Sequence, residues 1–120
     1  MISLTKKLLS VALLTATAFA SAQPKFPDGT IKLIVPFAAG GGVDNAARLL
    51  AKQMQANLNI SIVVENKPGA SGTIGAKFVQ ASTPDGQTLL FSASTQALTK
   101  LVIANPPYDP LTDFSYVARV

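Results

Sequence analysis

The residues best placed to do chemistry are three consecutive glycines, Gly40, Gly41 and Gly42, followed closely by Asp44. They come after an apolar run and before an amphipathic segment, an order that predicts a strand, a tight loop and the start of a helix. Because glycine has no side chain, a ligand can approach the backbone of such a loop closely. The first N–H groups of a helix lack intrahelical partners and lie at the positive end of its dipole, which suits an anion. A tight turn without a ligand is the alternative, since a single glycine motif is weak evidence.

The glycine motifs that bind nucleotides are incomplete in this chain. A P-loop requires G-x-x-x-x-G-K-[ST], and no glycine has a lysine at that offset. A dinucleotide loop requires G-x-G-x-x-G, and Asn45 occupies the position of the third glycine. Residues 69–72 resemble a nucleophile elbow, but the last glycine comes one residue early. The chain has no histidine, so a Ser71 nucleophile would lack its usual base.

The other polar residues near the glycines have ordinary structural explanations. Asp44 is expected to cap the helix or stabilise its dipole, for about 0.5–1 kcal/mol, in preference to contacting a ligand. Glu65 is expected to be a solvated or paired surface charge. Lys67 can attract an anion, although a flexible surface lysine is more common. Residues 94–96 can cap a helix, bind a ligand or do both, and Phe37 is expected to pack under its loop.

Three apolar runs predict strands over residues 31–35, 60–64 and 88–92. Each run is nearly continuous, which is typical of parallel strands covered on both faces. A helical apolar pattern follows the first strand, and its inward positions are Val43, Ala46, Ala47, Leu50, Met54 and Leu58.

Further helices are predicted over residues 73–81 and 96–104, and a fourth strand over residues 114–120. Alternation of strands and helices predicts an α/β fold with parallel pairing and right-handed crossovers.

In such a sheet, the loops that follow the carboxyl ends of the strands form the binding edge. Here these loops are residues 36–42, 66–72 and 92–96. All three are rich in Gly, Ala, Ser or Thr, and only Lys67 among them carries a charge. Three such loops at one edge are stronger evidence for a ligand site than one loop alone.

The composition excludes several classes of protein. The 120 residues contain no cysteine and no histidine, which excludes a disulfide framework and thiol chemistry and removes the commonest metal ligand. The net charge is +4, and removing the two lysines of the predicted export signal leaves +2. The remaining cations are scattered singly, whereas nucleic-acid or anionic-membrane binding needs a basic cluster.

Residues 1–22 predict a cleaved secretory signal peptide. A basic start precedes an apolar core over residues 8–19, and an A-x-A cleavage site occupies residues 20–22. The core is about a dozen residues, whereas a bilayer span takes roughly 20, so a membrane anchor is disfavoured. The expected mature start is Gln23, with Ser21 as the alternative, and the expected location is the periplasm.

Four motifs follow one another along the mature chain: P-F-A-A-G-G-G-V-D, V-V-E-N-K-P-G-A-S-G, P-D-G-Q-T-L-L and P-Y-D-P-L-T-D-F. In order and spacing they resemble the Bug receptors, the extracytoplasmic solute receptors of tripartite tricarboxylate transporters. The resemblance implies a type II periplasmic-binding-protein fold, in which two α/β lobes close on a small organic carboxylate. Residues 23–120 would then form the first lobe, with a mostly parallel sheet.

The resemblance also implies how the carboxylate is held, mainly by backbone amides, hydroxyls and bridging water from the strand-end loops. It assigns ligand binding to Phe37, Ala38, Ala39, Gly40, Gly41, Gly42, Ala70, Ser71, Gly72, Thr73, Ser94, Thr95 and Gln96. It implies no catalytic residue, metal or cofactor. The implied partners are the carboxylate and the membrane components of the transporter, with no nucleic acid.

Members of the resembled family continue through a second lobe and back to the first, so the resemblance implies a truncated first lobe with about half a cleft. We therefore expect the N-terminal lobe of an exported, non-enzymatic carboxylate receptor. The alternatives are a small nucleotide-using α/β enzyme domain and a non-functional truncated receptor. For one lobe alone, the expected affinity is millimolar or weaker, on the order of −4 kcal/mol.

Overall fold

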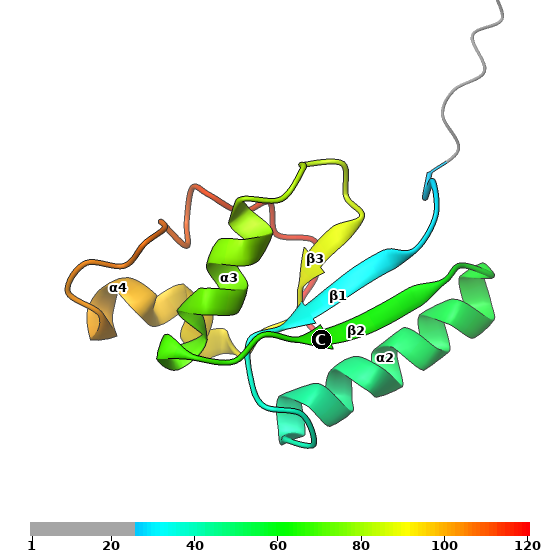
Figure 1. Cartoon of the computed structure of the whole chain (residues 1–120), viewed down its shortest axis with the longest axis horizontal. Coiled ribbons are helices and arrows are strands. Elements are labelled where there is room, and N and C mark those ends of the chain that lie inside the picture. Colours follow the sequence, from blue (N-terminus) through cyan, green and yellow to red (C-terminus); the bar gives the residue numbers. More distant parts are fainter. Residues whose placement is uncertain (1–25) are drawn as a thin grey trace, which may run out of the picture.

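The computed structural model describes residues 26–120 (Figure 1). The predicted signal peptide, its cleavage site and the mature start at Gln23 all lie outside the described residues. Within residues 26–120, every helix is too short or too polar to cross a membrane.

Three parallel strands form the sheet, in the order β2-β1-β3. They are β1 (Ile31–Val35), β2 (Ile62–Asn66) and β3 (Thr88–Leu90). Leu33, at the centre of β1, pairs with Val64 on one side and with Leu89 on the other. The parallel α/β arrangement is therefore as predicted, with β1 bounded as expected, β2 two residues later and β3 two residues shorter.

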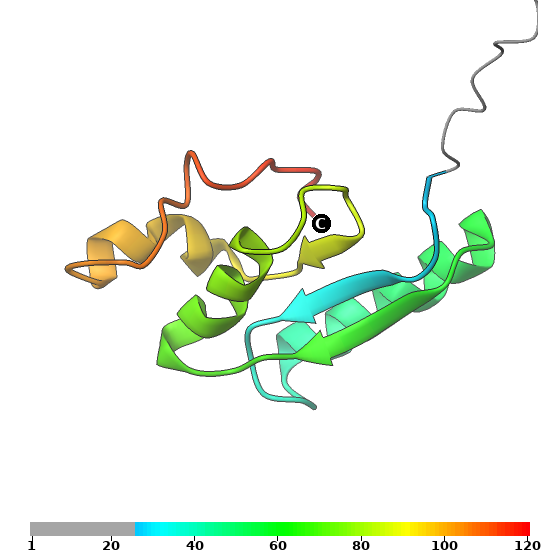
Figure 2. The same cartoon turned by 45° about the horizontal axis from the view of Figure 1, so that its top comes forward.

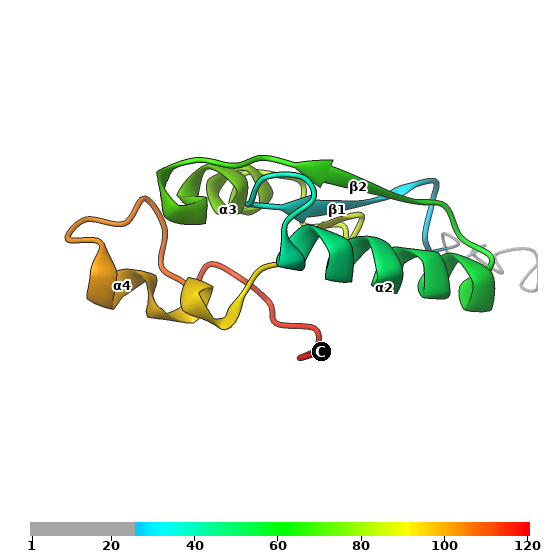
Figure 3. The same cartoon turned by 90° about the horizontal axis from the view of Figure 1, so that it is seen from below.

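Two helices cover the sheet. Helix α2 (Gly42–Leu58) runs along one face beside β1 and β2 (Figure 3), and α3 (Thr73–Gln80) contacts β3 and β1. The chain crosses from β1 to β2 through α2, and then from β2 back past β1 to β3 through α3. These two crossovers run in opposite directions across the sheet, so right-handed crossovers put α2 and α3 on opposite faces. Side chains alternate accordingly: Leu33 and Val35 belong to the apolar cluster beneath α2, while the fully buried Ile34 lies on the other face.

The buried stripe of α2 is narrower than its sequence pattern suggests. Ala47 and Ala51 are buried in the core cluster, but the predicted inward residues Ala46 and Leu58 are exposed, and Leu58 is 58% exposed. A 17-residue helix is about 25 Å long and a five-residue strand about 17 Å, so the last turn of α2 extends beyond the sheet. Ala46 lies outside this stripe because it is one residue, about 100°, from Ala47.

The structure departs most from prediction after β3. The expected helix over residues 96–104 is a 3-10 helix, η3 (Ser94–Leu98), continued by the single-turn α4 (Thr99–Val102). The predicted strand over residues 114–120 is wrong, since these residues have no regular secondary structure. A strand is stabilised by pairing its N–H and C=O groups with a neighbour, and in residues 26–120 the sheet pairs only β2, β1 and β3. Figure 2 shows this last segment returning toward β3.

Candidate ligand-binding edge

The three strand-end loops meet at the carboxyl end of the sheet. A Cβ atom built on Gly72 would lie 3.5 Å from Pro36 Cβ and 3.7 Å from Gln96 Oε1, so one glycine borders both other loops. Gly75, in the first turns of α3, is packed still closer, because a Cβ there would lie 2.8 Å from Pro36 Cβ and 2.9 Å from the Lys67 carbonyl oxygen. The structure thus brings together the three segments that carry the predicted contacts.

The first loop turns at Gly40, whose φ of +82° lies in the left-handed region that favours glycine. Gly41 has an ordinary φ of −73° and is the N-cap of α2, where it makes no side-chain capping bond. The hydrogen bond from Asn45 N to Gly41 O, 2.9 Å, begins the helix. The N–H groups of Gly42 and Val43 precede that bond and have no intrahelical acceptor.

The first loop presents its backbone to solvent. Its predicted contact residues Ala38, Ala39, Gly40, Gly41 and Gly42 are all exposed. Phe37 is half-buried and packs against the core cluster, as expected of a ring under the loop.

Asp44 lies under the loop and is 2% exposed. Its Oδ2 atom accepts hydrogen bonds from the Gly40 N–H at 2.8 Å and from Arg48 Nε at 2.9 Å. Its Oδ1 atom accepts from Asn66 Nδ2 at 2.9 Å. Asn66 also donates to the Phe37 carbonyl oxygen at 3.1 Å and accepts from Arg48 Nη2 at 2.9 Å. These bonds form a closed ring that joins the glycine loop, α2 and the end of β2.

The ring explains the acidity of Asp44. Hydrogen bonds from Arg48, from the Gly40 N–H and from Asn66 stabilise the carboxylate and lower the pKa of Asp44 to about 2, against the opposing effect of burial. Asp44 therefore stays charged at neutral pH, and the adjacent guanidinium balances its charge. The bond that Asp44 accepts from the Gly40 N–H agrees with its expected capping role at the start of the helix. Nothing in the neighbouring sequence indicated that Asp44 would be buried or would bond to Asn66.

The second loop is strained where it reaches the edge. Two non-glycine residues, Ala70 and Ser71, have positive φ values of 46° and 56°, between Gly69 at 127° and Gly72 at 89°. Strained backbone of this kind costs of order 1–3 kcal/mol per residue and clusters at ligand sites and switches. Among the four predicted contacts of this loop, Ala70 and Ser71 are exposed and Gly72 and Thr73 are buried. The Thr73 hydroxyl donates to the Ala70 carbonyl oxygen at 2.8 Å.

In the third loop, the Gln96 side chain bonds within the lobe. Its Nε2 atom donates to the Tyr108 hydroxyl, and its Oε1 atom accepts from Ser92 Oγ at 3.3 Å. Tyr108 is 4% exposed and lies 3.3 Å from Thr99 Oγ1, so it ties η3 to the later segment. The other two predicted contacts, Ser94 and Thr95, are exposed.

The charged side chains described at this edge occur in pairs of opposite sign. Arg48 pairs with Asp44, and Lys67 Nζ lies 3.8 Å from Glu65 Oε2, so of the two states expected for Glu65, solvated or paired, the structure shows the paired one. Lys67 also lies 4.2 Å from the centre of the Phe78 ring, a cation–π contact that holds it against α3. The exposed N–H groups and hydroxyls of the loops are therefore the main donors that the edge offers to an anion.

Sequence reasoning did not select Arg48, Asn66 or Tyr108. The i,i+4 spacing of Asp44 and Arg48 is a recognisable ion-pair pattern on a helix. Asn66 and Tyr108 bond to residues 22 and 12 positions away, so only the fold reveals their roles.

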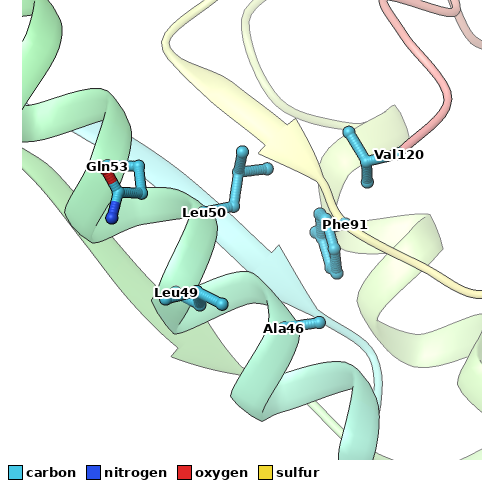
Figure 4. A pocket seen from close by; sticks show the side chains of 6 residues that line it. All are labelled: Ala46, Leu49, Leu50, Gln53, Phe91 and Val120. Carbon is cyan, nitrogen blue, oxygen red and sulfur yellow. The ribbon is translucent and has the colours of Figure 1, made fainter.

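A separate hollow of about 380 Å³ lies between α2 and the segment after β3 (Figure 4). Its lining residues are Ala46, Leu49, Leu50, Gln53, Phe91 and Val120. Gln53 is the one polar side chain among these residues. Burying a carboxylate without donors is costly, so this hollow does not suit an organic acid.

Comparison with known proteins assigns this geometry to a family. Residues 46–120 match the family model TctC, described as the tripartite tricarboxylate transporter family receptor. The chain belongs to this receptor family. A UPF0065 protein of Agrobacterium vitis is 40% identical over 111 residues, which is 90% of this chain and 32% of the relative. The chain thus spans about a third of the length of that relative.

Solved structures show the same fold in this family. The periplasmic binding protein BugD is 43% identical, with a TM-score of 0.70 over 74% of this chain and 30% of its own. MatC from Rhodopseudomonas palustris with bound malate is 36% identical, with a TM-score of 0.67 over 74% of this chain and 31% of its own. Rpa4515 of R. palustris with adipate is 35% identical, with a TM-score of 0.69 over 73% and 30%. The predicted type II periplasmic-binding-protein fold is confirmed, and the resemblance to Bug receptors with it.

Proposed function

We propose that this chain is the first lobe of a periplasmic receptor that captures a small organic carboxylate for a tripartite tricarboxylate transporter. The observation that carries the proposal is its likeness to two family structures holding dicarboxylates, malate and adipate. Malate and adipate differ in length, so the feature they share is the carboxylate group. Family membership supports a receptor that binds and releases its ligand without chemical change.

The glycine loop supports carboxylate binding through its open backbone. Gly42 has no positive φ, and a Cβ built on it would meet nothing within 4 Å. Neither backbone conformation nor packing therefore requires a glycine at this position, whereas close approach of a ligand does. The Gly40 N–H is already bonded to Asp44 and the Gly41 N–H to the Ala38 carbonyl oxygen, so we assign the ligand bonds of this loop mainly to the N–H groups of its other residues.

The second and third loops would complete the half-site with small donors. We assign ligand contacts to the exposed Ala70 and Ser71 and to the hydroxyls of Ser94 and Thr95. Gly72, Thr73 and Gln96 keep the assignment that the resemblance implies, with Gln96 bonding through capacity left by Tyr108 and Ser92. A nearly neutral set of donors suits a partner that must release its ligand to a transporter.

Thermal unfolding with added ligands tests the proposal against both alternatives. At tenfold excess over Kd, a ligand that binds only the folded state stabilises it by about 1.4 kcal/mol. For a domain of this size that shifts Tm by roughly 6–10 °C. Malate or adipate should raise Tm above a sodium chloride control of equal ionic strength. Stabilisation by ATP alone would indicate the nucleotide-using enzyme, and no stabilisation would indicate a non-functional product; either result would overturn the proposal.

The proposed location has its own test. Material released from the periplasm should begin at Gln23, or at Ser21 if the alternative site is used. N-terminal sequencing distinguishes the two. Recovery of the protein with Met1 intact in the membrane fraction would contradict periplasmic release.

A further inference from the structure

We propose that Asp44 is a positioning residue that sets the conformation of the glycine loop, and with it the donors of the carboxylate site. The part of this inference that concerns the ligand rests on the proposed function. The part that concerns the loop rests on geometry alone.

Asp44 replaces the capping group that the helix lacks. The N-cap of α2 is Gly41, which makes no side-chain capping bond. Asp44, at the third helical position, reaches back past the N-cap to the Gly40 N–H at 2.8 Å. This bond is made at the residue whose φ of +82° turns the loop, so it holds the turn at its least ordinary backbone position.

Asn66 fixes the other end of the same loop. Its Nδ2 atom donates to the Phe37 carbonyl oxygen and to Asp44 Oδ1, so its amide orientation is set by two acceptors. The loop is thus anchored through a carbonyl at Phe37 and an N–H at Gly40. The intervening Ala38 and Ala39 are exposed, and the two anchors restrain the backbone on either side of them.

Arg48 keeps this arrangement compatible with an anionic ligand. A buried carboxylate at the start of α2 cancels part of the positive potential that the helix dipole would offer to a bound anion. The Arg48 guanidinium bonds to both Asp44 and Asn66, so the ring has no net formal charge. Asp44 therefore orders the loop without repelling a carboxylate as an unpaired acid would.

A side-chain swap provides the test. In Asp44→Asn, a single amide oxygen replaces the two carboxylate oxygens that accept from Gly40, Arg48 and Asn66. If that oxygen keeps the bonds to Gly40 and Arg48, the new amide N–H₂ faces the Asn66 Nδ2 donor. Adding Asn66→Asp restores complementarity: the amide oxygen at position 44 accepts from Gly40 and Arg48, and its nitrogen donates to the acid at position 66. The swap retains the charge of the ring, but it loses the bond to the Phe37 carbonyl and turns a carboxylate oxygen toward that carbonyl oxygen, so it restores the Gly40 anchor while weakening the Phe37 anchor.

The readout is amide hydrogen exchange of Gly40 by NMR in the purified full chain. We expect exchange at Gly40 to rise about tenfold or more in Asp44→Asn and to fall by at least about threefold from that value in the swap, the remaining increase reflecting the weakened Phe37 anchor. Asp28→Asn removes the same charge from an exposed site and serves as the matched control, with no effect on Gly40. Unchanged exchange in Asp44→Asn, or no recovery in the swap, overturns the proposal. If Asp44→Asn does not fold, the swap decides alone: Gly40 exchange less than about tenfold faster than in wild type supports the proposal, and faster exchange overturns it.

Malate titration separates this inference from the proposed function. If wild type binds malate, we expect a loss of affinity of about tenfold in Asp44→Asn and partial recovery in the swap, because the donors are misdirected and then restored at Gly40 but not at Phe37. If wild type binds neither malate nor adipate, the proposed function fails. Gly40 exchange still decides whether Asp44 positions the loop.

Discussion

Two regions of this lobe are held together in different ways. In residues 31–90, the sheet and α2 bury a shared apolar cluster, and a closed ring of side-chain bonds fixes the glycine loop. In residues 91–120, one buried tyrosine connects η3 to the chain that follows it, while large apolar side chains face solvent. Leu101 and Val117 are each 81% exposed. The first region carries its own stabilisation, and the second presents apolar surface of the kind that marks a contact surface.

The difference bears on recognition. The first two loops follow β1 and β2, which pair with each other along their whole length, whereas the third leads into η3 and is fixed through Tyr108. We expect the first two loops to keep their shape in the lobe by itself. The third should depend more on its surroundings, so the two regions should respond differently to substitution.

The largest expected difference is in stability. Leu33→Ala removes a buried side chain from the centre of β1 and should lower the free energy of unfolding by about 3 kcal/mol. Leu101→Ala makes the same chemical change at an exposed site and should alter it by less than about 0.5 kcal/mol. Urea unfolding measures both. Equal losses would show that residues 91–120 are as well packed as the sheet region.

The next difference concerns bulk and charge at the binding edge. Gly42→Val should lower malate affinity about tenfold or more, because its side chain would block close approach of the ligand to the backbone. A Cβ at this position meets no protein atom within 4 Å, so the substitution fits the folded lobe. The change in free energy of unfolding should stay below about 1 kcal/mol. Lys67→Ala should weaken binding by only about twofold, since Lys67 is already paired with Glu65. Calorimetry giving the reverse order would place the site away from the glycine loop.

The hydrogen-bonded ring around Asp44 should make the stability of the lobe depend on pH in acid and not near neutral pH. The folded pKa of Asp44 is about 2, below its ordinary value of 3.8, so its contribution to stability is complete above pH 3.8 and is lost as the pH falls to about 2. Lys100 likewise lowers the pKa of Asp109 in the second region, with the same sign. Between pH 5 and pH 2, the free energy of unfolding should therefore fall less steeply in Asp44→Asn than in wild type. A slope unchanged by this substitution, but reduced by Asp109→Asn, would assign the acid sensitivity to the second region.

The smallest expected effect is that of salt. The charges described at the binding edge are paired, so screening should change malate affinity little. Raising sodium chloride from about 50 mM to about 500 mM should alter Kd by less than about threefold. A tenfold or greater loss in titrations would require an unpaired cation in the site.

The parts of the fold that local pattern determines were predictable. The continuous apolar run of β1 and the helical spacing from Val43 to Leu58 place both elements within about one residue, because each pattern lies inside a single element. The glycine loop followed from the same reading. The close packing of Gly72 and Gly75 against Pro36 was not predictable, because packing between elements leaves no local pattern in the sequence.

The remaining features depend on partners distant in sequence. Asn66 reaches Phe37 across 29 positions, and Gln96, in a 3-10 helix, bonds to Tyr108 across 12 positions. The predicted strand over residues 114–120 had suitable residues but no neighbour to pair with in the described chain. Local propensity could indicate these segments without fixing their structure.

The central claim is that the three-loop edge is one half of a carboxylate site. Titration of the ¹⁵N-labelled chain with malate, followed residue by residue by NMR, tests it most directly. We expect amide shifts concentrated in residues 38–43, 70–73 and 94–96, with a Kd that is millimolar or weaker, because a single lobe leaves the ligand open to water. Shifts centred on the apolar hollow at Leu50 and Phe91, or micromolar binding by this lobe alone, would contradict the account.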